Sequence, residues 1–196
     1  MYVLKSPAQA VITVKNSRFL SELNSVQSQA EARERLHELK QKHADASHVV
    51  HAFVTGPGGE ICGMSDDGEP GGTAGRPVLD VLRGSGLTNC ILTVTRWFGG
   101  TLLGTGGLVK AYGDAAKAVI AECGMEPLVS RKHFSLTADY SDYESIKRLL
   151  QQFNISDVKE EFGARARIEG LVQEDEMDAL SKKIQDITKG KIMLAD

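Results

Sequence analysis

The spacing of apolar residues from residue 134 onward switches between the two-residue period of a strand and the 3.6-residue period of a helix. Phe134, Leu136 and Ala138 alternate with polar residues, whereas Ile146 and Leu149 share one helical face. The predicted elements are strand, helix, strand, strand, helix and strand, over residues 134–140, 141–153, 155–162, 164–172, 174–190 and 191–195. This β-α-β-β-α-β order predicts a ferredoxin-like domain over residues 129–196.

The preceding part of the chain predicts a separate α/β unit over residues 1–128. Ser28 followed by Glu31 is a capping box, which predicts a helix start. The apolar run from Cys90 to Val94 is typical of a strand buried on both faces. The other predicted elements are strands at 11–14, 19–26 and 49–54 and helices at 77–83 and 106–122. The expected fold class is therefore α/β (α+β), with two domains that meet near Pro127.

Composition narrows the function classes. The 196 residues are 41% hydrophobic and 25% charged, as in globular domains. A formal net charge of -3 argues against a protein that coats nucleic acid along its length. Three widely spaced cysteines, Cys62, Cys90 and Cys123, predict reduced thiols and no disulfide framework. No apolar stretch approaches the ~20 residues of a membrane span, so we expect no membrane contact and a cytoplasmic location.

The segment Ser65–Pro77 holds three carboxylates and four glycines, a composition that cannot bury much apolar surface. Asp66, Asp67 and Glu69 offer the oxygen ligands that Mg²⁺ prefers, so a magnesium site is one interpretation. Free amides at the following helix start would bind an anion. A rigid turn explains the same composition equally well, with the acids capping amides or pairing with Arg76.

A second glycine-rich stretch, Arg96–Lys110, follows the predicted central strand and opens a long helix. This context favours an anion site at the helix N-terminus, although the stretch contains neither a P-loop nor a G-x-G-x-x-G pattern. Between residues 76 and 117 the chain has five basic and two acidic residues, so the segment is net basic. The candidate residues for binding phosphate or nucleic acid are Thr73, Arg76, Arg96, Thr105, Gly106, Gly107 and Lys110. Alternatively, the glycines only let the two loops pass close together.

Two histidines precede the segment Ser65–Pro77, which we call the acidic loop. His48 and His51 lie three positions apart on a predicted strand, so they point to opposite faces and do not form a metal pair. His48 could face the acidic loop and act as a general base. A histidine held in the core by its own hydrogen bonds is the simpler interpretation of each.

Two long motifs resemble those of the IMPACT/YigZ family. The first runs from Ser65-Asp-Asp-Gly-Glu-Pro70 through Thr73-Ala-Gly-Arg-Pro77. The second comprises Thr95-Arg-Trp-Phe-Gly-Gly100 and Leu103-Gly-Thr-Gly-Gly-Leu-Val-Lys-Ala-Tyr112. The resemblance implies an N-terminal domain like the second domain of ribosomal protein S5. It also implies a C-terminal domain similar to the fifth domain of elongation factor G. Eukaryotic relatives regulate translation by binding a partner of a stress kinase, mainly through an additional domain.

Three function classes follow. The first is a ribosome- or RNA-associated regulator of translation that binds phosphate groups at its glycine-rich loops, with no evident DNA specificity. The second is a Mg²⁺-dependent nucleotide-binding or hydrolytic enzyme that uses Asp66, Asp67 and Glu69. The third is an adaptor that binds a protein partner. The resemblance identifies no catalytic residue, and the binding protein is the leading hypothesis.

Overall fold

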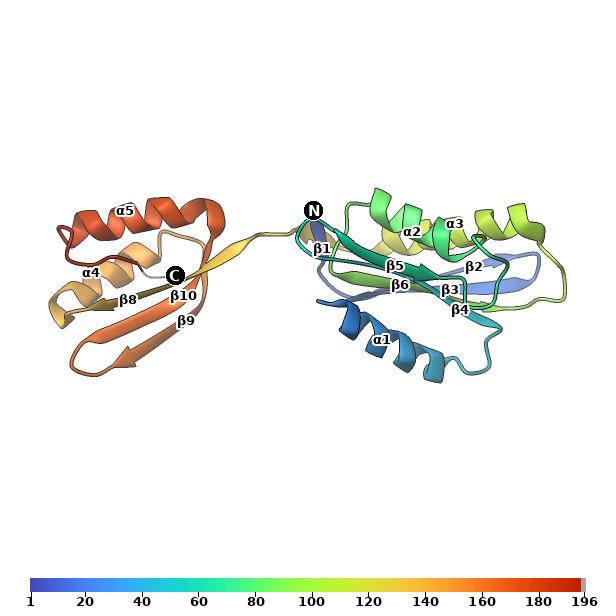
Figure 1. The fold of residues 1–196 in the computed structure, drawn as a ribbon, viewed down its shortest axis with the longest axis horizontal. Helices are drawn as coiled ribbons and strands as arrows, with labels where there is room; N and C mark the ends of the chain where they lie inside the picture. The colour runs from blue at the N-terminus through green and yellow to red at the C-terminus, as the bar shows by residue number, and fades with distance from the viewer. Residues whose placement is uncertain (195–196) are drawn as a thin grey trace. The chain divides into compact units, whose positions relative to one another are not determined.

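The computed structural model describes residues 1–194, which fall into two compact units. The first is Met1–Leu128 and the second begins at Val129. Each unit combines helices with antiparallel strands, which confirms the predicted mixed α/β class (Figure 1). None of the helices described is long and apolar enough to cross a membrane.

The first unit is built on a five-stranded antiparallel sheet with the strand order β2-β3-β6-β4-β5. The strands are β2 (Ala8–Val14), β3 (Ser17–Ser25), β4 (His48–Thr55), β5 (Ile61–Ser65) and β6 (Cys90–Trp97). β6 is the central strand, and all its residues except Trp97 are buried. The apolar run at Cys90–Val94 therefore predicted its burial correctly.

Helices cover both faces of this sheet (Figure 1). α1 (Gln29–Lys42) lies on one face, and α2 (Gly75–Gly84) and α3 (Gly104–Glu122) lie on the other. The Ser28 hydroxyl accepts a hydrogen bond from the Glu31 amide at 3.2 Å, which confirms the predicted cap of α1. The main core lies between the sheet and the pair α2 and α3, where Phe19 and Tyr112 meet edge to face.

Three short strands of this unit were not predicted. β1 (Tyr2–Leu4) pairs with β7 (Met125–Pro127), and β5 forms one edge of the main sheet. β5 is exposed or half-buried throughout and contains Gly63, so it has no apolar alternation to mark it. β1 and β7 are specified by pairing across the length of the unit, and β5 by its hairpin with β4, and not by their own patterns.

The second unit has a three-stranded antiparallel sheet of order β8-β10-β9 with two helices. Its elements are β8 (Arg131–Ala138), α4 (Tyr140–Leu150), β9 (Ile155–Phe162), β10 (Ala166–Gln173), η1 (Glu174–Glu176) and α5 (Met177–Ile187). The predicted last strand is wrong for residues 191–194, which form no strand, while Ala195 lies outside the described residues. Ile192 and Leu194 pack on the core, which explains why the segment had a strand-like apolar spacing.

Candidate functional site

The two glycine-rich loops meet at one pocket of the first unit, with a volume of about 580 Å³. Four segments line it: the start of β4, the acidic loop, the end of β6, and the second loop with the first turns of α3. The lining residues are Ser47, His48, Glu69, Pro70, Arg96, Phe98, Leu102, Leu103, Gly104, Thr105 and Leu108. Segments far apart in sequence therefore converge on one hollow. We call it the α3 pocket.

A buried ion pair forms part of the pocket wall. The Arg96 Nη1 donates to Glu69 Oε1 at 2.6 Å, and the two residues are only 5% and 8% exposed. Tyr112 donates its hydroxyl to the same Glu69 oxygen at 2.8 Å, and burial raises the pKa of this phenol. The Arg96 Nε has no hydrogen-bond partner among the described residues. Breaking such a pair by removing one partner costs about 3–5 kcal/mol.

The second loop is fixed by contacts with the β2–β3 turn and the start of β4. The Ser17 hydroxyl accepts from the Gly99 amide at 3.1 Å, and the Ser47 hydroxyl accepts from the Phe98 amide at 3.2 Å. A Cβ on Gly99 would lie 2.0 Å from the carbonyl carbon of Asn16, which excludes any side chain there. Glycine is therefore required at Gly99 because the loop backbone touches the hairpin turn.

The anion at the start of α2 is a carboxylate of the chain itself, that of Asp66. The Asp66 carboxylate accepts from the amides of Gly72, Ala74 and Gly75 at 2.8, 3.0 and 2.8 Å. Burial alone would raise the pKa of this carboxyl, but the three amide donors outweigh it and lower the pKa below its usual value. The amides that the sequence made available for an external anion are thus already used by Asp66.

The other predicted residues near α2 also have partners. The Thr73 hydroxyl donates to the Pro70 carbonyl at 2.6 Å, and the exposed Arg76 pairs with Asp80 at 2.9 Å. Neither Thr73 nor Arg76 lines the α3 pocket. The acidic loop is therefore mainly a structural cap, as the simpler interpretation of its composition held.

The three carboxylates of the acidic loop do not converge on a common centre. Asp66 binds amides, Asp67 accepts from the Val49 amide at 2.6 Å and pairs with Lys40, and Glu69 pairs with Arg96. Residues 1–194 contain no group of three or more His, Cys, Asp or Glu side chains arranged to hold a metal ion. The predicted Mg²⁺ site at these acids does not form in this part of the chain.

The start of α3 differs because no side chain of residues 1–194 accepts a hydrogen bond from its first amides. Leu103 occupies the N-cap position, the first turn holds no acidic residue, and Gly104, Thr105 and Gly106 are exposed. The first amides of a helix have no partner within the helix, and the macrodipole makes this end electropositive. Gly104 and Thr105 line the pocket, so the start of α3 forms part of its wall.

Comparison with known proteins agrees with this fold. Residues 15–120 match the Impact N-terminal domain, and residues 136–191 match a domain of unknown function, DUF1949. The chain belongs to the IMPACT family. An IMPACT family member of Haemophilus influenzae is 33% identical over 193 residues, which cover 96% of this chain and 94% of that protein. YigZ of Escherichia coli, also an IMPACT family member, is 31% identical over 191 residues, which cover 96% and 94%.

A solved structure supports the same assignment. A crystal structure described as that of a hypothetical protein covers 98% of this chain and 95% of its own, with a TM-score of 0.72 and 31% identity. The resemblance seen in the two motifs is thereby confirmed at the level of the family. In this IMPACT family chain those motifs form the α2 cap and the walls of the α3 pocket.

Four of the five basic residues predicted to give this IMPACT family chain a basic surface have acidic partners, whereas Arg83 makes no ion pair within residues 1–194. Arg96 is buried against Glu69, Arg76 pairs with Asp80, and Lys110 and Lys117 both pair with Asp114. Lys110 remains exposed on α3 but does not line the pocket. Any anion binding therefore depends on the helix start more than on a broad field of cations.

The aromatic residues of the second motif have different surroundings. The Arg18 guanidinium lies 4.7 Å from the centre of the Trp97 ring, and the Trp97 indole N–H donates to Asp45 at 2.9 Å. Phe98 lines the pocket and is 49% exposed. Leu102, which sequence analysis did not select, also lines it and is 83% exposed. The one sequence signal for the exposure of Leu102 was its position between the pairs Gly99-Gly100 and Gly106-Gly107.

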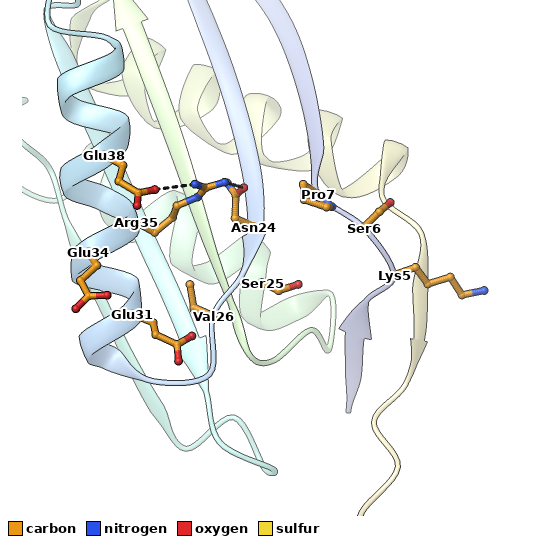
Figure 2. Close-up of a pocket in the computed structure, with 10 residues that line it drawn as sticks. All are labelled: Lys5, Ser6, Pro7, Asn24, Ser25, Val26, Glu31, Glu34, Arg35 and Glu38. Carbon is orange, nitrogen blue, oxygen red and sulfur yellow. Dashed lines mark hydrogen bonds and ion pairs between the residues drawn. The ribbon is translucent and has the colours of Figure 1, made fainter. Parts of the chain in front are cut away.

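A second cavity of this IMPACT family chain, of about 400 Å³, lies beside α1 (Figure 2). Glu31, Glu34 and Glu38 line it, and Arg35 donates to Glu38 and to Asn24 at 2.7 and 2.8 Å (Figure 2). Three carboxylates from one helix repel an anion, although Lys5 also lines the cavity and makes no ion pair within residues 1–194. The cavity therefore favours an anion less than the α3 pocket, where a helix start and Arg96 lie on the wall.

Proposed function

We propose that this chain is a binding protein that acts in translation in the cytoplasm, and that its α3 pocket receives a phosphate group of ribosomal or other structured RNA. One observation carries the proposal: an uncapped helix start opens onto a pocket that is also lined by a buried arginine. The role in translation is the one that the family resemblance implies.

The helix start suits a phosphate for geometric and electrostatic reasons. Successive amides of the first turn point out of the helix end, and the dipole of the 19-residue helix adds to their attraction for an anion. A Cβ added at Gly106 would meet no heavy atom within 4 Å, so the space beside this turn is open. The Thr105 side chain is a further donor at the pocket, and the buried Arg96 adds positive charge to its wall.

The rim of the pocket suits a nucleotide that is part of a larger molecule. Phe98 and Leu102 offer exposed apolar surface beside the polar interior. Nucleic-acid bases stack on aromatic rings irrespective of their sequence. A local site of this kind also agrees with the net charge of -3, because one phosphate contact does not require a basic surface.

The test compares Gly106→Asp with Gly106→Asn. Gly106 lies in the first turn of α3 but does not line the pocket itself. Both side chains fit the open space there, but only Asp brings a negative charge close to the helix start at which the phosphate is expected. A like charge at about 4 Å costs roughly 1–4 kcal/mol, so Gly106→Asp should weaken binding of a labelled structured RNA by about tenfold or more relative to Gly106→Asn. Equal affinities of the two variants, measured by fluorescence anisotropy at low salt, would exclude the α3 start as the phosphate site.

A second pair of variants tests the same site by gain of affinity. Leu102→Lys adds one cation at the exposed rim, and Leu102→Gln is its uncharged control. Leu102→Lys should tighten RNA binding and steepen the slope of log K against log salt by up to about 0.9.

A protein-interaction adaptor is the second candidate, favoured by the exposed apolar rim at Phe98 and Leu102. The Leu102 pair separates the two functions. Binding to an apolar protein surface would weaken with both Leu102→Lys and Leu102→Gln, whereas RNA binding would tighten with the lysine variant alone.

A further inference from the structure

One histidine of the α3 pocket has a fixed tautomer. The His48 Nδ1 lies 2.9 Å from the backbone carbonyl oxygen of Asp67. A carbonyl oxygen can only accept a hydrogen bond, so Nδ1 carries the hydrogen. In the neutral ring the other nitrogen, Nε2, is then a hydrogen-bond acceptor.

Asp67 itself is held in place by two contacts of its own side chain. Its carboxylate accepts from the Val49 amide at 2.6 Å and pairs with Lys40 of α1. The carbonyl that orients His48 therefore belongs to a residue that is anchored independently of the pocket. The ring orientation is set before any ligand arrives.

No residue between 1 and 194 donates a hydrogen bond to this acceptor nitrogen. His48 Nε2 lies 3.8 Å from Glu69 Oε1, which is too far for a hydrogen bond, and in the neutral ring both atoms are acceptors. Glu69 Oε1 already accepts from Arg96 and Tyr112, whereas no residue between 1 and 194 donates to Glu69 Oε2. Glu69 and His48 thus give the pocket unused acceptors beside the amides at the start of α3.

A ligand that pairs with both the donors and the acceptors of the pocket needs anionic oxygens and a hydroxyl donor close together. A ribonucleotide has this combination, because its 2′-hydroxyl donates while its phosphate accepts. A deoxyribonucleotide lacks the donor and would leave the His48 acceptor unpaired in a partly buried site. The volume of about 580 Å³ lies within the range of small-molecule sites and accommodates one nucleotide.

We propose that His48 Nε2, together with Glu69, accepts a hydrogen bond from the 2′-hydroxyl of the nucleotide whose phosphate sits at the start of α3, so that the pocket selects RNA over DNA. This inference rests on the proposed phosphate site and adds the substrate class. His48 is then a specificity-determining residue of that site.

The experiment measures affinities of the full chain for one structured oligonucleotide in three forms: RNA, DNA and 2′-fluoro RNA. The fluoro form keeps the A-form shape of RNA but replaces the hydroxyl by a fluorine that cannot donate, so it separates recognition of the hydroxyl from recognition of helix shape. RNA should bind about tenfold more tightly than the fluoro form, the factor expected for one hydrogen bond of about 1.4 kcal/mol. Equal affinity of the two forms would overturn the inference.

Two variants locate the effect at His48. In His48→Asn the amide nitrogen takes the place of Nδ1 and keeps the bond to Asp67, but nothing replaces Nε2. In His48→Gln the amide oxygen reaches the region of Nε2 as an acceptor. We expect His48→Asn to lower RNA affinity to that of the fluoro form and His48→Gln to retain part of the preference. A full RNA preference in His48→Asn would overturn the role of His48.

The outcomes distinguish this inference from the proposed function. If Gly106→Asp weakens binding but RNA and 2′-fluoro RNA bind alike, the phosphate site stands and the hydroxyl contact fails. If no form binds, or the two Gly106 variants bind alike, both proposals fail. The fluoro comparison uses the unaltered chain, so it remains decisive even if a His48 variant does not fold.

Discussion

The starts of α2 and α3 are both glycine-rich helix N-termini on the same face of one sheet, yet they are used differently. At α2, the Asp66 carboxylate accepts hydrogen bonds from three backbone amides. At α3, no side chain from the described part of the chain, residues 1–194, caps the first turn, and that turn contains no acid. Glycine content therefore indicates only that amides are accessible. Whether a site for an external anion remains depends on whether the chain supplies a carboxylate of its own.

The largest change in stability is expected when the buried Arg96–Glu69 ion pair, which links the two glycine-rich loops, is broken. Arg96→Ala leaves Glu69 buried without its cation, so it should lower the free energy of unfolding by about 3–5 kcal/mol. Denaturant unfolding of the purified variant measures this loss. Arg76→Ala is the matched control, because its pair with Asp80 is exposed and should contribute less than about 1 kcal/mol. Similar losses for the two arginines would contradict the assigned roles.

The next effect tests the cap of α2. Asp66→Asn removes the charge that three amides bind, and hydrogen bonds to charged groups contribute about 1.5–3 kcal/mol, so a loss near the lower value is expected at this half-buried position. The folded-state pKa of Asp66 is lowered, so its stabilisation is fully present above the unfolded value of about 3.9 and is lost as the pH falls through the folded value.

Acid unfolding is the corresponding measurement. The free energy of unfolding of the unaltered chain should fall more steeply below about pH 4 than that of Asp66→Asn. Parallel curves for the two proteins would show that the carboxylate of Asp66 does not stabilise α2.

A smaller effect of opposite sign is expected at α3. Gly106→Asp supplies the missing carboxylate to the helix start, which should stabilise the protein by about 0.3–1 kcal/mol relative to Gly106→Asn. Thermal unfolding at low salt measures the difference, which added salt should reduce. If the aspartate variant is no more stable, the amides of α3 are not available, and the comparison between the two helix starts breaks down.

The smallest effect concerns the surface of α3. Lys110 pairs with Asp114 at 2.6 Å, but the Lys110 side chain is 77% exposed. Lys110→Ala should change the free energy of unfolding by less than about 0.5 kcal/mol. A loss above about 1 kcal/mol would mean that α3 depends on this pair as α2 depends on Asp66.

Local patterns predicted the parts of the fold that local physics determines. The apolar run at Cys90–Val94 identified the central strand, and Ser28 with Glu31 identified the start of α1. β5 was missed because its pairing with β4 specifies it, and the strand expected at 191–194 does not form. Sequence analysis brought the two glycine loops into one hypothesis but left open which of them had free amides.

The partners of the site residues could not be predicted, because they are distant in sequence. Sequence analysis considered Arg76 as the cation for the acidic loop, whereas Arg96, 27 residues from Glu69, takes that role. The orientation of His48 depends on a carbonyl 19 residues away. Neither pairing has a local pattern, since both arise from the order of strands in the sheet.

The contact between Gly99 and the β2–β3 turn limits how this chain can be altered. Hairpin tips with small polar residues ordinarily tolerate inserted segments and fused tags. Here the backbone of the exposed tip at Asn16 packs directly against Gly99, with no room for even one methyl group between them. A label or insertion at this tip would disturb the α3 pocket from outside it, so tags for binding studies belong elsewhere.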